Sequence, residues 1–197
     1  MSQVIQAMSD ADLLGMMVGS KTAVRLLQDA RGSLSALLNE SIPPYDLQSK
    51  ANTKLQVAKE LVRRSLLEAL RHRDALSSPA SVRDYLRMTL TGRDYEVFMV
   101  LFLDAQNRVI EPEEMFRGTL TQTSVYPREV VKRSLFNNAA AVIFAHNHPS
   151  GVAEPSHADE ILTQSLKQAL ALVDVKVLDH FVIAGGGLMS FAERGLL

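Results

Sequence analysis

Two histidines, a serine and an aspartate form the group of residues in this chain whose types and spacing are best suited to chemistry. His146 and His148 are separated by one residue, and Ser156 and Asp159 follow after a short loop. Alternate residues of a strand point to the same face, so both imidazoles can be aimed at one point if 139–145 is a strand that continues into His146. The loop is long enough to bring the carboxylate of Asp159 back to them.

Two imidazoles and one carboxylate suit zinc, and they leave a fourth coordination position open for water. An open position is typical of a catalytic zinc site, because bound water then ionises near neutral pH. A general base close to that water is also needed. The chain has no cysteine, which excludes disulfides, thiolate-bound metals and a cysteine nucleophile.

The pattern His-x-His followed by Ser-x-x-Asp resembles the JAMM (MPN-plus) metalloprotease motif. The longer run His-Asn-His-Pro-Ser-Gly is similar to the RadC family, of the UPF0758 type, and so are 116–120, 127–130, 178–183 and 193–196. The resemblance is strong over 78–197 and weaker over the N-terminal half, where 9–14 and 32–38 carry it.

The resemblance implies a mixed α/β, cytidine-deaminase-like JAMM/MPN domain preceded by a small all-α domain. It implies one zinc ion per chain, held by His146, His148 and Asp159, with Ser156 polarising a substrate carbonyl or stabilising the oxyanion. It also implies a glutamate base at the start of an early strand. Glu96, just before the apolar run 97–103, is the expected base, and the alternatives are Glu111, Glu113 and Glu114.

The function expected from these residues is a zinc-dependent hydrolase, metallopeptidase-like, that acts on a protein or peptide substrate at an amide or isopeptide bond. The alternative is a non-catalytic interaction module associated with DNA repair, in which the metal site is structural or vestigial. Other zinc classes fit less well. A nucleobase deaminase needs a cysteine pair, and a helical zincin needs His-Glu-x-x-His, which is absent.

Some of the same residues also have purely structural interpretations. Ser156 and Asp159 are spaced as a helix capping box, and both roles are compatible. We expect His157 to be exposed and His180, within an apolar run, to be structural. The glycines 185–187 lack the spacing of a nucleotide-binding loop and predict a turn.

The elements that position this group lie in the second of two halves. Residues 9–73 have helical periodicity, with a break at 42–45, and the Ser- and Pro-containing stretch 77–81 predicts a linker. We therefore expect domains at 1–76 and 77–197. In the second domain the pattern predicts helices at 82–88, 127–137 and 155–173, and strands at 97–103, 108–111, 115–122, 139–145, 175–177 and 180–184.

Composition limits the partners. The net charge of −1 gives no overall basic field, and no apolar run approaches the roughly 20 residues that a membrane span requires. Without a signal sequence, the expected location is cytoplasmic. The RadC family carries a helix-hairpin-helix in the N-terminal half, but the matching stretch 47–55 has no glycine. DNA binding is thus a weakly supported possibility, and we expect this half to position the catalytic domain or to form a homo-oligomer.

Overall fold

The computed structural model describes residues 5–39, 50–118 and 124–197. The chain divides into two compact units, Met1–Val62 and Arg63–Leu197. The predicted break at 42–45, the beginning of the stretch 47–55 and the end of the predicted strand 115–122 lie outside the described residues. Within the described part of the chain, no helix is long and apolar enough to cross a membrane.

The first unit is helical, as its periodicity predicts. It contains α2 (Asp10–Val18), α3 (Ser20–Asp29), α4 (Leu34–Asn39) and the start of α5 (Lys50–His72). Ser9 caps α2 by accepting a hydrogen bond from the Asp12 amide, and Gly19 ends it at a φ of 88°. In the described part of this unit, Leu14, Ala23, Leu26 and Leu55 form a small core with a few partly buried neighbours.

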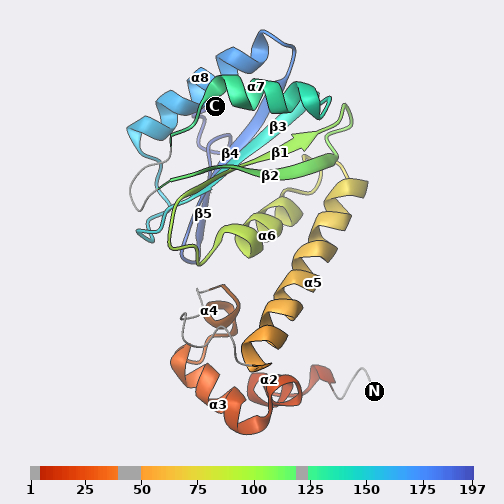
Figure 1. Ribbon diagram of the computed structural model, residues 1–197, viewed down its shortest axis with the longest axis vertical. Helices are drawn as coiled ribbons and strands as arrows, with labels where there is room; N and C mark the ends of the chain where they lie inside the picture. Colours follow the sequence, from red (N-terminus) through yellow and green to blue (C-terminus); the bar gives the residue numbers. More distant parts are fainter. Residues whose placement is uncertain (1–4, 40–49, 119–123) are drawn as a thin grey trace. The chain divides into compact units, whose positions relative to one another are not determined.

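The second unit holds the remaining elements. They are α6 (Pro79–Leu90), β1 (Val97–Leu103), β2 (Val109–Arg117), α7 (Pro127–Phe136), β3 (Ala141–Asn147), α8 (His157–Ala171), β4 (Lys176–Ala184) and β5 (Gly187–Ser190). The sheet order is β2-β1-β3-β4-β5. Among the described strands, β3 and β4 are the one parallel pair, and α8 connects them (Figure 1).

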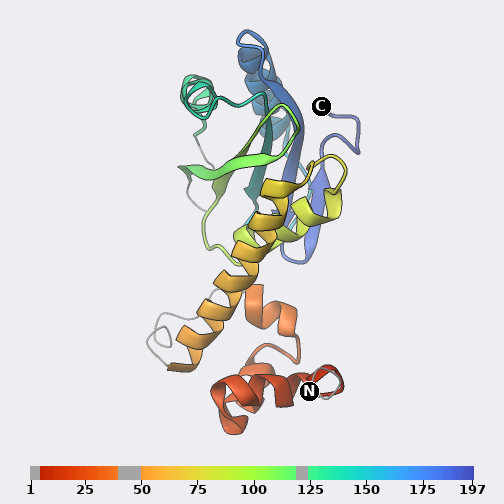
Figure 2. The same ribbon diagram turned by 90° about the vertical axis from the view of Figure 1, so that its right-hand side faces the viewer.

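The central strands are continuous apolar runs because both of their faces are covered. In β1 the side chains of Val97, Met99 and Leu101 pack with α6 on one face, whereas Phe98 and Val100 pack with α7 and α8 on the other. Figure 2 shows α6 and α7 on opposite sides of the sheet. The unit therefore has three layers, and the mixed α/β fold class is confirmed.

Three local predictions were wrong. Residues 79–81 of the predicted linker belong to α6, because proline is favoured at the first helical position. The two strands predicted around Pro112 are one strand, β2, which is an edge strand and so loses little by lacking an amide there. Likewise, the strands predicted at 175–177 and 180–184 are one continuous strand, β4. The last strand, β5, begins at Gly187 and was not predicted.

Candidate metal centre

The two histidines lie at the end of β3, on the face that carries α8. Val142, Phe144 and His146 alternate along this face, and the first two belong to the core beneath α8. His148 lies just beyond the strand, but its amide still donates to Ile183 O of β4 at 2.8 Å. The chain thus remains extended through His148, which gives the two imidazoles a common direction, as the His-x-His spacing predicts.

Asp159 is held in place by the first turn of α8. Ser156 is the N-cap of this helix, and its hydroxyl accepts from the Asp159 amide at 3.2 Å. In return Asp159 Oδ2 accepts from the Ser156 amide and the Ser156 hydroxyl, each at 2.7 Å. The capping box predicted from the sequence is confirmed, and it fixes where the carboxylate points.

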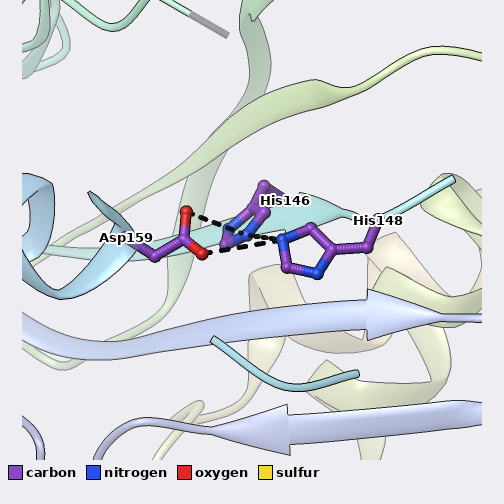
Figure 3. A group of neighbouring side chains, drawn as sticks. All are labelled: His146, His148 and Asp159. Carbon is purple, nitrogen blue, oxygen red and sulfur yellow. Dashed lines mark hydrogen bonds and ion pairs between the residues drawn. The ribbon is translucent and has the colours of Figure 1, made fainter. Parts of the chain in front are cut away.

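The three predicted ligands converge, as Figure 3 shows. The Nε2 atoms of His146 and His148 are 2.9 Å apart, and they lie 3.5 and 3.6 Å from Oδ1 and Oδ2 of Asp159. Donor atoms placed tetrahedrally about 2.1 Å from zinc are about 3.4 Å apart. The donor set and its spacing fit a metal ion, and this group could hold one.

The electrostatics of the group reflect a carboxylate facing two imidazoles. Burial alone would raise the pKa of Asp159, but the imidazoles of His146 and His148 that face it hold that pKa far below its usual range. The hydrogen bond to Asp159 raises the pKa of His148, and this effect exceeds the opposing effect of partial burial. Asp159 is therefore ionised at neutral pH and available as a ligand.

Each histidine also has a contact through its second ring nitrogen. His148 Nδ1 lies 3.0 Å from the Val152 carbonyl, and His146 Nδ1 lies 2.9 Å from His180 Nε2. Such contacts orient metal-binding imidazoles. From the sequence, we expected His180 to have only a structural role. The only sequence signal for this contact is a histidine inside an apolar strand.

A cavity of about 610 Å³ opens beside the cluster. His146, His148, Asp159, Ser156 and Glu96 all line it, so the structure brings the predicted base and the predicted ligands to one place. The alternative glutamates on β2 are engaged in ion pairs. Glu111 pairs with Arg71, Glu113 with Arg133 and Glu114 with Arg93. His157, expected to be exposed, is exposed.

Asn147 lies between the two histidines and its side chain faces β1. Its Oδ1 accepts from the Val97 amide at 2.8 Å, and its Nδ2 donates to the Tyr95 carbonyl at 2.9 Å. Glu96 lies between these two backbone partners. The sequence offered no reason to assign Asn147 a chemical role beyond shaping the loop or contacting a substrate. A side chain that bonds to the backbone of another strand has no local sequence signature.

Comparison with known proteins gives the family. A family model described as a RadC-like JAB domain matches residues 76–196. The chain belongs to the RadC family. A UPF0758 protein of Nitrosomonas europaea is 56% identical, over 97% of this chain and 90% of its own length. One from Chromobacterium violaceum is 52% identical, over 100% of this chain and 93% of its own. One from Nitrosospira multiformis is 66% identical, over 73% of this chain and 64% of its own length.

The predicted RadC resemblance is thereby confirmed. The RadC match covers both histidines, Asp159 and Glu96. The relatives from N. europaea and C. violaceum align over almost all of the chain, so the similarity includes its N-terminal helical unit.

Proposed function

We propose that this RadC protein is a zinc-dependent hydrolase of amide bonds, with a metallopeptidase-like site. The observation that carries the proposal is the shared cavity, which places His146, His148 and Asp159 beside Glu96 and Ser156. A purely structural metal site has no need of an open cavity or of an additional carboxylate beside the ligands.

Zinc is the metal that best matches two imidazoles and one carboxylate without thiolates. When bound, zinc polarises a carbonyl and lowers the pKa of coordinated water to about 7. The protein contributes the three ligands and a partly enclosed cavity in which their geometry is fixed by a strand end and a helix cap.

Glu96 has the chemistry required of the general base. Its carboxylate would take a proton from the water whose oxygen attacks the amide carbon. As the C–N bond breaks, the same proton would pass from Glu96 to the leaving nitrogen. The products are a carboxylic acid and an amine, and Glu96 returns to its ionised form.

Ser156 would stabilise the oxyanion by donating a hydrogen bond to it. In the structure its hydroxyl donates to Asp159 Oδ2, so the hydrogen must rotate from that oxygen toward the substrate. The rotation leaves Oδ2 with the Ser156 amide as a remaining donor, at 2.7 Å. The cap can therefore survive the change.

A peptide or isopeptide bond is the substrate class that we propose. The cavity wall beside the ligands contains Phe98, Val125, Tyr126 and Leu162, which suit an apolar side chain next to the scissile amide. For the N-terminal unit we propose self-association or positioning of the catalytic unit. Met16, Val57 and Leu61 are exposed there, which favours a protein surface as partner over DNA.

Two measurements test the hydrolase. Metal analysis at neutral pH should find about one zinc per chain, lost in the His146→Ala/His148→Ala variant. Digestion of a mixed peptide library in ¹⁸O-labelled water should then place the label in new carboxyl ends. Glu96→Gln should keep zinc and lose roughly 100-fold or more in rate, whereas the control Glu113→Gln should keep both.

The outcomes separate the two candidate functions. Zinc with Glu96-dependent label incorporation supports the hydrolase. If the wild type and the two glutamate variants all bind zinc but none incorporates the label, the non-catalytic module is favoured. Equal rates of hydrolysis for the wild type and Glu96→Gln would mean that Glu96 is not the general base.

A further inference from the structure

His180 is a polar side chain in an apolar environment. It lies in β4 opposite Phe144 of β3 and is completely buried. Its ring stacks on Phe191, with centroids 4.7 Å apart, and meets the edges of Phe98 and Phe144. A buried imidazole in such a site is costly unless both nitrogens have partners, and here both do.

The partners of His180 connect two of the candidate ligands. Its Nε2 lies 2.9 Å from His146 Nδ1, and its Nδ1 lies 2.7 Å from Thr163 Oγ1. The Thr163 hydroxyl in turn donates to the backbone carbonyl of Asp159 at 2.6 Å. A continuous chain of hydrogen bonds therefore runs from the His146 ring to the backbone carbonyl of Asp159.

The proton positions along this chain follow from counting donors. Thr163 has one hydroxyl hydrogen, and the Asp159 carbonyl uses it. Thr163 can then only accept from His180, so the proton of the neutral His180 ring is on Nδ1. His180 Nε2 is left with a lone pair and accepts from His146 Nδ1–H. His146 Nε2 thus carries a lone pair rather than a proton on the side that faces His148 and Asp159, which is the tautomer that a metal ligand requires.

We propose that His180 and Thr163 are positioning residues of the metal site, which set the tautomer and ring orientation of His146 and tie it to the first turn of α8. The inference rests on the metal site in the proposed function, but not on hydrolysis. Without the Thr163 hydroxyl, the His180 proton can move to Nε2. His146 would then have to accept at Nδ1 and carry its proton on Nε2, where the metal binds.

Zinc affinity of the full chain, measured by competition with a chelator of known affinity, tests the proposal. His180→Phe keeps an aromatic ring among the three phenylalanines but makes no hydrogen bond, and should weaken zinc binding about 10- to 100-fold. His180→Gln, whose amide oxygen can accept from His146, should recover part of that loss. Thr163→Val should weaken binding about 10-fold, whereas the matched variant Thr163→Ser should bind as the wild type does.

Two further readouts separate positioning from a general structural role. The visible spectrum of the Co²⁺-loaded protein should change in His180→Phe and Thr163→Val, because the coordination geometry relaxes. Thermal unfolding of the metal-free proteins shows whether a variant is folded. If His180→Phe does not fold, the comparison of Thr163→Val with Thr163→Ser decides alone.

The possible failures are distinct. A wild type that binds no zinc would overturn the metal site itself. A wild type that binds zinc, with folded His180→Phe and Thr163→Val variants of unchanged affinity and Co²⁺ spectrum, would overturn the positioning role and leave the proposed function intact.

Discussion

Asn147 and Val97 lie 50 residues apart in the sequence, yet the side-chain Oδ1 of Asn147 accepts the Val97 backbone amide at 2.8 Å. The Nδ2 of Asn147 donates to the Tyr95 carbonyl at 2.9 Å. The residue between the two histidines therefore holds the backbone on both sides of Glu96. One segment, 146–148, supplies two candidate ligands and fixes the position of the candidate base.

Asn147→Ala should therefore affect the base more than the metal. The Val97 amide, which is buried, loses its partner, and the free energy of unfolding should fall by about 1–3 kcal/mol. Zinc affinity should change little, whereas kcat should fall by up to about 100-fold, because a shift of about 1 Å in a catalytic group has that effect. Asn137→Ala, which removes a side-chain bond to Arg133 O at the C-terminal end of α7, is the control. A large loss of zinc in Asn147→Ala with unchanged kcat would contradict this assignment.

The two Ser-x-x-Asp caps of the chain form a matched pair of experiments. Ser9 caps α2 through the Asp12 amide at 3.2 Å, the same distance as between Ser156 and Asp159. Ser9→Ala and Ser156→Ala should each cost about 0.5–2 kcal/mol of stability in the unit that holds the helix. Chemical denaturation of the full chain measures both losses.

Only Ser156→Ala should also lower zinc affinity and turnover, because only Asp159 faces the histidines. Equal zinc affinity and equal turnover in the two variants would mean that Ser156 acts as a helix cap and nothing more.

Zinc should stabilise the folded chain by mass action. At a free concentration 100 times its Kd, a ligand that binds only the folded state adds about 2.7 kcal/mol. For a unit of this size we expect the melting temperature to rise by about 10 °C. Scanning calorimetry with and without a chelator measures the change. The His146→Ala/His148→Ala variant should not respond, and neither should the wild type with Mg²⁺, which prefers oxygen ligands. An equal response to zinc in the double variant would place the metal elsewhere.

Stability of the metal-free protein and zinc affinity should change with pH in opposite directions. The Asp159 carboxylate raises the pKa of His148, so protonated His148 stabilises the metal-free fold. This contribution is complete below the unfolded pKa of about 6.5, and it is lost as the pH rises through the higher folded value. Zinc binds only the neutral imidazole, so its affinity should increase over the same range.

Melting temperatures of the metal-free wild type and of His148→Gln, compared between about pH 6 and pH 8, isolate the contribution of His148. The advantage of the wild type should shrink as the pH rises. An advantage that grows with pH in the absence of metal would contradict the ion pair with Asp159. His157→Gln, at an exposed histidine, should follow the wild type. Because the pKa of Asp159 is lowered, the stabilisation that its carboxylate provides is lost only in strong acid, far below this pH range.

Local patterns in the sequence predicted much of the fold and the centre of the candidate site. The apolar runs of β1 and β3, the proline that begins α7 and the cap of α8 each depend on neighbours within a few residues. The alternation of side chains along a strand was enough to bring His146 and His148 together, and the spacing from Ser156 to Asp159 was enough to predict the cap.

The tertiary structure decided what depends on strand register and on partners far apart in the chain. It placed Glu96 at the cavity and Glu113 in an ion pair with Arg133. The sequence had left open which glutamate lies near the candidate ligands. The tertiary structure also set His180 against His146 through the parallel pairing of β3 with β4.

By itself, therefore, the sequence determined the candidate ligand types, their spacing and the layered α/β architecture. The side chains that contact the candidate ligands and flank the candidate base were decided only in the folded chain. The reason is physical: Asn147, Thr163 and His180 satisfy buried or partly buried hydrogen bonds to residues 17 to 52 positions away. Such partners are chosen when the burial of both faces fixes the register of the sheet, and no short-range periodicity records that choice.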